Sequence, residues 1–291
     1  MAQSVASSVE QNKVEFTQAQ LDAEVIQDNE FKGNYFQWLK NQFTFLDRFA
    51  WLLYGLGLGF QFHIWVGAPI TWSSTIAFLG IATGYLCTVL MGAKGWQKVQ
   101  ESDGTVMEHL ISGRSANGLL GSISVIFYCI LNAQAGHWFS IVDQLIFFAL
   151  IDIEMVIMWR TWGHGESEDT KDATWKQWLI IILGLLIFWA ALTPVGYWLN
   201  DSQPIVDSLV LAFGAMASIM YVKRNSSSYI LFLLSNVVNI VLWAGALDKG
   251  LSPAALAMLA MTIMYMISSF YGFYNMHFVK KGQTRPVVIN H

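Results

Sequence analysis

The chain has 291 residues, of which 55% are hydrophobic and only 12% are charged, and its net charge is −4. An ordinary soluble domain carries about 25% charged residues, so this composition excludes a simple soluble globule. Sixteen basic against twenty acidic residues also leave no basic surface for nucleic acid. Thirteen tryptophans and nineteen phenylalanines are typical of helices with aromatic residues at a membrane interface. The composition predicts an integral membrane protein.

Residues 1–48 are expected to form a cytoplasmic tail that ends in a helix. The first 30 residues are polar and acidic and show no cleavable signal. Four apolar residues then recur at helical spacing and predict an amphipathic helix along the membrane interface. A helix that packs on the soluble side of the protein would give the same pattern, and both interpretations stay open. The four residues are Phe36, Leu39, Phe43 and Leu46.

Eight later segments are long and apolar enough to cross a bilayer, which takes roughly 20 residues per helix. Very short connections join several of them, so neighbouring spans must be antiparallel. The expected spans are 49–66, 72–92, 115–133, 140–159, 177–198, 205–222, 229–247 and 253–278.

The basic residues fix the expected orientation of these spans. With a cytoplasmic N-terminus, fifteen of the sixteen Lys and Arg residues fall on the cytoplasmic side, and only Lys249 falls outside. Such a bias is the usual marker of the inner face of a membrane. We therefore expect a multi-pass membrane protein with both termini, including the tail 279–291, in the cytoplasm.

An internal repeat groups the spans. The third and fourth spans follow the same plan as the seventh and eighth, about 115 residues later, so that Ser124 corresponds to Asn239 and Tyr128 to Trp243. The expected fold is all-α, with parallel three-helix units joined by a linker helix in a 3+1+3 arrangement. The units are 72–159 and 205–278, the linker is 177–198, and the helix 49–66 stands outside the repeat.

The second half carries a specific family resemblance. It contains P-x-x-D-S from residue 204, then V-K-R, an Asn-bearing helix that ends in Leu-Trp, and Y-G-x-Y-N from residue 271. This pattern resembles the PnuC nicotinamide riboside transporters. The first half agrees more loosely, through L-M-G-A-K-G at 90–95 and a few single positions, namely Asn117, Gly121, Tyr128, Met158 and Trp159.

The resemblance implies a helix arrangement similar to the SWEET sugar transporters and a location in a bacterial inner membrane. It also implies facilitated uptake of a vitamin-like nucleoside, which a cytoplasmic kinase then phosphorylates and traps. Some positions depart from the family pattern and leave the substrate open among nicotinamide riboside, thiamine, riboflavin and deoxynucleosides. They are Tyr229 and Phe232 in place of W-x-x-W, Met276 in place of a final Trp, and Gln144, Leu150, Asp152 and Met155 in span four. The loop at 96–113 is longer than expected.

Asn236, Asn239 and Trp243 share one face of the seventh span. Amides at membrane depth offer donors and acceptors for a carboxamide or a ribose hydroxyl, which predicts a substrate site. The alternative is that the two amides bond neighbouring helices and contribute only ~0.6–2 kcal/mol to packing.

Span four supplies Gln144 and Asp152, eight residues apart and within about 80° on a helix. Asp143 and Glu154 are expected on other faces. Asp152 has three interpretations: recognition of a substrate hydroxyl, protonation coupled to transport, or a carboxyl that bonds helices together.

The remaining candidates are weaker. His63 is expected to pack or to lie at the interface, and Asp207 is expected to cap its own helix. Aromatic and polar residues at the corresponding depth in other spans complete the expected substrate site, namely Ser124, Tyr128, Tyr229, Phe232, Tyr265, Tyr271 and Asn275.

Three functions remain open: a uniporter for nicotinamide riboside or a relative, a proton-coupled symporter, and a membrane protein that transports nothing. The sequence contains no Walker A motif, no H-E-x-x-H and no nucleophile elbow, so we expect neither enzymatic activity nor a metal or other cofactor. The expected partners are a small-molecule substrate, the lipid bilayer and a cytoplasmic kinase. The sequence is also compatible with a homo-oligomer.

Overall fold

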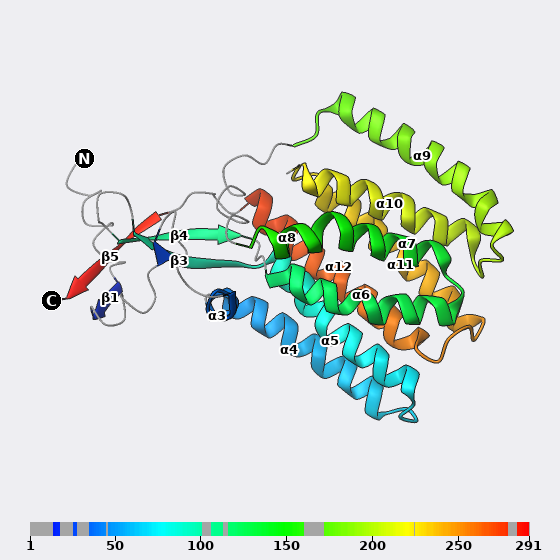
Figure 1. Ribbon diagram of the computed structural model, residues 1–291, viewed down its shortest axis with the longest axis horizontal. Coiled ribbons are helices and arrows are strands. Elements are labelled where there is room, and N and C mark those ends of the chain that lie inside the picture. Colours follow the sequence, from blue (N-terminus) through cyan, green and yellow to red (C-terminus); the bar gives the residue numbers. More distant parts are fainter. Residues whose placement is uncertain are drawn as a thin grey trace.

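The computed structural model describes residues 14–17, 26–27, 35–44, 46–100, 106–112, 116–159, 172–223, 225–278 and 284–290. A long bundle of helices forms one part of the molecule and a small sheet adjoins one end of it (Figure 1). We call the end of the bundle next to the sheet the sheet end. The opposite end, which holds the turns 67–71, 136–137, 199–203 and 249–254, is the loop end.

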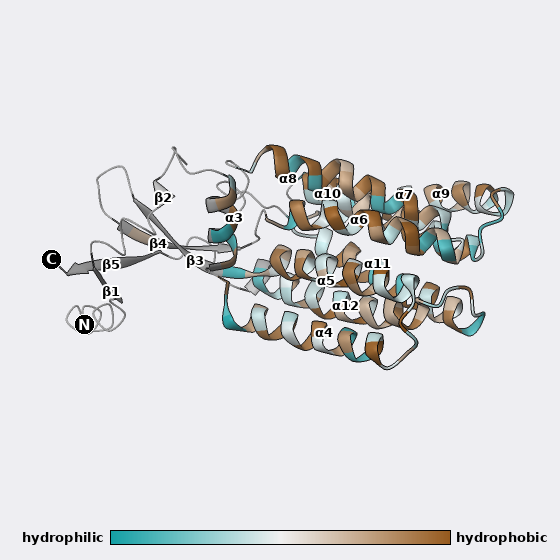
Figure 2. Cartoon of the chain, turned by 60° about the horizontal axis from the view of Figure 1, so that its bottom comes forward, coloured by the Kyte–Doolittle hydropathy of each residue, from teal (hydrophilic) through white to brown (hydrophobic). Residues whose placement is uncertain are grey.

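Seven described helices are long and apolar enough to cross a membrane. The hydropathy-coloured view shows apolar residues along their length (Figure 2). All seven correspond to expected spans, with bounds that differ by at most two residues. They are α4 (Arg48–Val66), α5 (Trp72–Gly92), α6 (Ala116–Ala135), α9 (Trp175–Trp198), α10 (Pro204–Val222), α11 (Ser228–Asp248) and α12 (Ala255–Phe278).

The expected span 140–159 is divided into three consecutive helical segments. These are α7 (Trp138–Phe147), the π-helix η2 (Phe148–Asp152) and α8 (Ile153–Ile157). A π-helical turn has i→i+5 bonds and rotates the chain less per residue than an α-helix, so it changes which face later side chains occupy. The segment runs without a gap, but the eight-span count stays a prediction.

Six helical units close into a ring. Packing contacts join α5 to α6, α6 to the α7–η2–α8 unit, α7 to α10, α10 to α11, α11 to α12, and α12 back to α5. The remaining two long helices lie outside the ring: α4 contacts α5 and α12, and α9 contacts α10. In the apolar 18-residue stretch of α9, only 11% of the residues are buried, whereas 61% are buried in the corresponding stretch of α5. Most of the α9 surface is therefore available to lipid.

Local sequence explains where the helices begin and turn. Thr71 caps α5, because Ser74 N donates to Thr71 Oγ1 at 3.1 Å while Ser74 Oγ accepts from Thr71 N at 2.8 Å. Pro204 starts α10 at a position where its missing N–H costs nothing. The turn after α6 uses Gly136 at φ +72°, a conformation that favours glycine.

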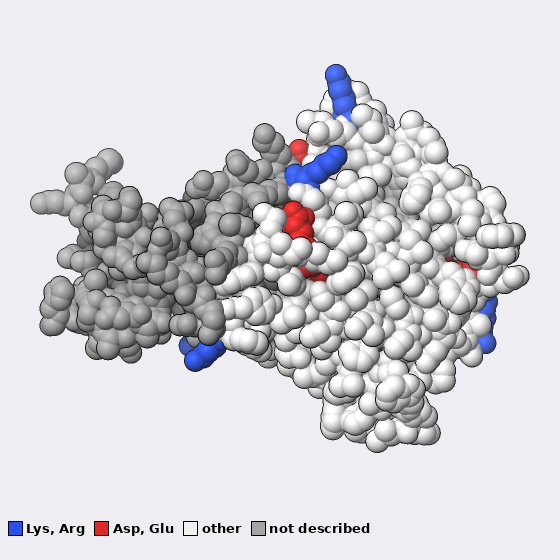
Figure 3. All heavy atoms as spheres, in the orientation of Figure 1, with Lys and Arg blue, Asp and Glu red and all other residues white. Residues whose placement is uncertain are grey.

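Charged side chains are sparse over the described face of the bundle (Figure 3).

The sheet adds strands that the expected all-α class did not include. It has five strands in the order β1-β5-β4-β3-β2. The segment expected as a long loop at 96–113 contains an antiparallel pair, with Lys94 opposite Ser112 and Gln100 opposite Val106. The strands are β1 (Val14–Thr17), β2 (Ile26–Gln27), β3 (Lys94–Gln100), β4 (Val106–Ser112) and β5 (Thr284–Asn290).

Both tails contribute to this sheet. β1 from the N-terminal tail pairs in parallel with β5, which follows α12, and β5 pairs in antiparallel fashion with β4. The helix expected within 31–48 is present as α3 (Tyr35–Thr44). Its ends contact other elements, since the rings of Tyr35 and Trp159 are 5.6 Å apart and those of Phe43 and Trp51 are 6.4 Å apart.

Candidate functional site

The ring of six helices encloses a cavity of about 160 Å³. Every helical unit of the ring contributes side chains to its lining. A single water needs only about 10–15 Å³, so the cavity has room for much more than bound solvent. Ten of the twelve residues expected at the substrate site line it: Ser124, Tyr128, Gln144, Asp152, Tyr229, Phe232, Asn236, Asn239, Trp243 and Tyr265.

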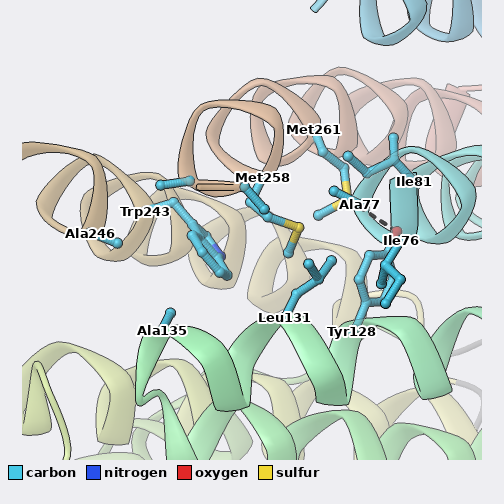
Figure 4. Close-up of a cluster of buried hydrophobic side chains, with 12 residues drawn as sticks. Ile76, Ala77, Ile81, Tyr128, Leu131, Ala135, Trp243, Ala246, Met258 and Met261 are labelled. Carbon is cyan, nitrogen blue, oxygen red and sulfur yellow. Dashed lines mark hydrogen bonds between the residues drawn. The ribbon is translucent and has the colours of Figure 1, made fainter. Parts of the chain in front are cut away.

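Apolar clusters line the cavity toward both of its ends. At the loop end, Trp243 of α11 lies across from Leu131 of α6, with Met258 and Met261 of α12 beside them (Figure 4). At the sheet end, a second cluster gathers around Tyr229, whose ring lies 6.4 Å from the ring of Phe232. The cavity therefore lies inside the bundle, with a cluster of large side chains toward each end.

The face of α11 presents two amides to the cavity. Asn236 Nδ2 donates to Ser269 Oγ of α12 at 3.0 Å, and Asn239 Nδ2 donates to its own helix at Ser235 O, 3.2 Å away. In the described part of the chain, neither amide oxygen accepts a hydrogen bond. Trp243 continues this face and is 2% exposed. The arrangement offers acceptors beside an aromatic ring.

Two tyrosines form the facing wall. The hydroxyls of Tyr128 on α6 and Tyr265 on α12 are 2.5 Å apart, and Tyr128 also donates to Met261 Sδ at 3.0 Å. Both hydroxyls lie against Gly84 of α5, where a Cβ atom would be 2.2 Å from the oxygen of Tyr128. A residue larger than glycine at position 84 would therefore displace this pair.

Two carboxyl groups reach the cavity, although only Asp152 was expected there. Asp143 was expected on another face, because nine α-helical residues turn by about 180°. The five residues of η2 each turn the chain by roughly 80° instead of 100°, so Asp152 lags by about 100°. This rotation brings Asp152 close to the face of Gln144 and leaves Asp143 on the lining as well.

Each carboxyl rests against a glycine of a neighbouring helix. A Cβ atom on Gly121 of α6 would be 2.3 Å from Asp152 Oδ1, and one on Gly214 of α10 would be 1.9 Å from Asp143 Oδ1. Only glycine leaves room for the carboxyls at these contacts. Position 121 was among those that carried the family resemblance, and its packing against Asp152 gives it a physical role.

The other two expected site residues lie outside the cavity lining. Tyr271 donates its hydroxyl to Asp47 Oδ2, the cap of α4, and Asn275 Nδ2 donates to Gly92 O at 2.7 Å. Gly92 of α5 and Gly272 of α12 meet at this point, where a Cβ on Gly92 would be 2.9 Å from Gly272 Cα. Both side chains join helices at the sheet end.

Asp207 caps a different helix from the one expected. Its carboxylate accepts hydrogen bonds from Phe139 N at 2.7 Å, from Ser140 N at 3.0 Å and from the hydroxyl of Ser140. These groups form the first turn of α7, whereas Asp207 belongs to α10. The expectation that Asp207 caps its own helix was wrong, because the unpaired amides of α7 lie nearer to its side chain.

A buried histidine sits beside this cap. Gln203 Nε2 donates to Leu242 O at 2.9 Å and lies 3.2 Å from His137 Nε2, whose ring packs edge-on against Trp243. Burial lowers the pKa of His137 to about 4. This histidine is therefore neutral at ordinary pH. By contrast, His63 of α4 is exposed, and its neighbour Gln61 is the residue that bonds α12, through Ala257 O at 3.1 Å.

Sequence reasoning missed further polar lining residues. Asn132 lies on the cavity four residues after Tyr128 and eight after Ser124, so helical spacing from residues already chosen would have found it. Its Oδ1 is buried without a hydrogen-bond partner among the described residues. Ser268 of α12 is also on the lining, and its hydroxyl is buried without a hydrogen-bond partner within the same described part of the chain. Ser268 lies three residues after Tyr265, so the same helical spacing would have found it.

Comparisons with known proteins agree with this architecture. A family model described as nicotinamide mononucleotide transporter matches residues 106–277, more than half of the chain. The nicotinamide riboside transporter PnuC of Neisseria mucosa is 25% identical over 232 residues, which cover 78% of this chain and 79% of the relative. The PnuC of Haemophilus influenzae is 24% identical over 232 residues, covering 74% of this chain and 83% of the relative.

A solved structure has the same fold. The crystal structure of the vitamin B3 transporter PnuC superposes with a TM-score of 0.64 at 23% identity, covering 84% of this chain and 97% of that chain. The matched family region takes in four of the six units of the ring completely, together with nearly all of α12. The chain belongs to the nicotinamide mononucleotide transporter family, the family of the PnuC membrane transporters.

Proposed function

We propose that the protein carries nicotinamide riboside across the membrane by facilitated diffusion. The observation that supports this function best is the cavity, which lies inside a ring of six helices with an apolar cluster toward each end. A carrier that alternates between two faces of a membrane needs a site of this kind near the middle of its helices. The two named relatives are nicotinamide riboside transporters, which points to the same substrate.

We propose a 3+1+3 arrangement for the eight spans. The contacts around the ring support it, because they repeat when α5, α6 and α7–η2–α8 are exchanged for α10, α11 and α12. In this scheme α9 is the linker and α4 the additional helix. The proposed divisions are a tail 1–48, the helix 49–66, a first bundle 72–159, the linker 177–198, a second bundle 205–278 and a tail 279–291.

The proposed substrate site combines amides and rings. The free oxygens of Asn236 and Asn239 suit a carboxamide NH₂ or ribose hydroxyls, and Trp243 with the Tyr128–Tyr265 pair offers apolar surfaces for a flat ring. Gln144, Ser124, Tyr229 and Phe232 complete the wall. A kinase in the cytoplasm would phosphorylate the imported nicotinamide riboside and so keep it inside the cell.

The first prediction concerns the energetics of transport. Purified protein in liposomes should bring nicotinamide riboside to equal concentrations on both sides, and a one-unit inward proton gradient should not change that end point. The reason is that a carrier with no coupled ion has no differential free energy with which to accumulate substrate. The measurement is uptake of radiolabelled substrate with and without the gradient.

Proton-coupled symport is the second candidate, because the cavity holds two carboxyls rather than one. Substrate that rises several-fold above its external concentration, with the rise abolished in Asp152→Asn, would establish symport and contradict facilitated diffusion. Absence of any uptake by folded protein would contradict both candidates.

The second prediction tests the amide face. Asn236→Leu and Asn239→Leu should each weaken nicotinamide riboside binding by at least roughly tenfold, because a lost buried hydrogen bond costs about 1–3 kcal/mol. Binding can be measured by titration of detergent-purified protein. Val237→Leu is the control, since this exposed residue on the same helix should change nothing. Normal binding in both asparagine variants, with earlier thermal unfolding, would make the amides purely structural.

The third prediction tests the orientation, with both termini in the cytoplasm. Cysteines at the exposed loop-end positions Ala68 and Lys249 should react with an impermeant thiol reagent in intact cells, whereas one at the exposed sheet-end position Lys176 should not. The parent chain is the control for its own two cysteines. Labelling at Lys176 from outside would refute the proposed topology.

A further inference from the structure

The cavity has an acidic lining with no matching positive charge. Of the residues that the structure describes, Asp143 and Asp152 are the only acidic ones in the lining, and none of the lining residues is Lys, Arg or His. Asp152 is 1% exposed. The Oδ1 atoms of both carboxyls are buried and have no hydrogen-bond partner among the described residues.

A third carboxyl, that of Asp207, provides a comparison, because its role is purely structural. Asp207 is fully buried, yet it accepts three hydrogen bonds from the first turn of α7. Those donors satisfy its oxygens and hold α7 and α10 together. Asp143 and Asp152 have no such donors at Oδ1, so their oxygens are not accounted for by packing alone.

Each of these carboxyls packs against a glycine. Gly121 lies against Asp152 and Gly214 against Asp143, and neither glycine has a side chain that could donate. A buried carboxylate is costly unless a cation or several donors surround it. The lining supplies no cation, so a positively charged occupant of the cavity would provide the counter-charge that these carboxylates lack.

The two carboxyls also lie at different depths. Nine residues along the helix correspond to roughly 13 Å, with Asp143 nearer the loop end and Asp152 nearer the sheet end. Both face the same cavity as the amides of α11. A cation that travels through the cavity would therefore meet a carboxyl at each of two levels.

We propose that Asp143 and Asp152 make the cavity selective for an organic cation, by supplying the counter-charge to a positively charged ring. The inference rests on the proposed function and adds a charge requirement to it. An organic cation fits better than a metal ion, because no group of three or more His, Cys, Asp or Glu side chains gathers among the described residues. Amides and aromatic rings line the same space.

Two forms of one compound test the charge requirement. Nicotinamide riboside carries a positive pyridinium ring, while its reduced dihydro form is neutral and keeps the same carboxamide and ribose. Wild-type protein should bind the cation at least tenfold more tightly than the reduced form. Asp143→Asn and Asp152→Asn should each reduce that ratio at least fivefold, because the affinity for the cation falls more than the affinity for the reduced form.

The control is Asp248→Asn, which removes an exposed carboxyl at the loop end and should leave the ratio unchanged. The titrations should give the same ratio in sodium and in potassium buffers. A sodium-dependent ratio would show that the carboxyls hold an inorganic cation and would overturn the inference.

The outcomes separate the inference from the proposed function. Equal binding of both forms to wild-type protein overturns the charge requirement while the nicotinamide riboside site stands, and this result needs no variant to fold. Folded wild-type protein that binds neither form refutes the proposed substrate instead. An unchanged preference in both folded asparagine variants also overturns the role of the two carboxyls.

Discussion

Replacing Gly92 by valine is expected to destabilise the protein by about 3 kcal/mol or more. The Cβ atom would lie 2.9 Å from Gly272 Cα and 3.1 Å from Gly272 N, and backbone atoms cannot move aside as a flexible side chain can. α5 and α12 would separate, and the hydrogen bond from Asn275 to Gly92 O would be lost. Gly92→Ala should show a smaller loss in the same direction. Thermal unfolding of detergent-purified protein measures both.

Gly59 of α4 provides the matched control. No atom lies within 4 Å of the position where its Cβ would stand, so Gly59→Ala and Gly59→Val should leave the unfolding temperature unchanged or slightly higher. If Gly92→Val unfolds at the wild-type temperature, the close crossing of α5 and α12 does not exist in the folded protein.

Asp207→Ala should lower stability by about 2–6 kcal/mol. Two backbone N–H groups of α7, those of Phe139 and Ser140, would then be buried without their acceptor, and each costs about 1–3 kcal/mol. We expect the apparent unfolding temperature to fall by roughly 5 °C or more. Asp207→Asn should have an intermediate effect, since its amide keeps one acceptor oxygen but turns an NH₂ group toward the other donor.

Asp248→Ala controls for the loss of an acidic side chain at the same end of the bundle, because Asp248 is exposed. It should leave the unfolding temperature within 1–2 °C of wild type, the range of about 0.5 kcal/mol expected for surface substitutions. Wild-type stability in Asp207→Ala would mean that the first turn of α7 finds other acceptors and that this cap contributes little.

Helix positions could be predicted because a span is defined by the length and polarity of a contiguous segment. The expected segment 72–92 coincides with α5, and 177–198 begins two residues after α9 does. The residues on the cavity face of α11 could be predicted in the same way. Spacings of three and four residues place Asn236, Asn239 and Trp243 together on any regular helix.

Irregular helix geometry could not be predicted from spacing. The calculation that separated Asp143 from Asp152 assumed 100° per residue throughout, and the π-helix η2 makes that assumption fail between them. The segment Phe148–Asp152 contains neither proline nor glycine, so nothing in its composition marks the change. A second cavity carboxyl was missed for this reason.

Hydrogen-bond partners that lie far apart in the chain could not be predicted from the sequence either. Asp207 follows Pro204 at the start of a helix, where capping of the same helix is the ordinary expectation. Its donors lie 67 and 68 residues earlier in the chain, and only the packing of α7 on α10 brings them together. The β3–β4 pair did leave a local signal, because Asp103-Gly104 between two alternating segments is a hairpin dipeptide.

The sheet has a mechanical consequence for the helices attached to it. Three residue pairs, from Met107 opposite Pro286 to His109 opposite Thr284, join the segment between α5 and α6 to the segment after α12. The two halves of the ring are thus fastened together by backbone at one end. Bodies joined in this way turn about the joint as a pivot, and the displacement that a given rotation produces grows with distance from it. The turns at the loop end, furthest from the sheet, would therefore travel furthest when the halves rotate against each other (Figure 1).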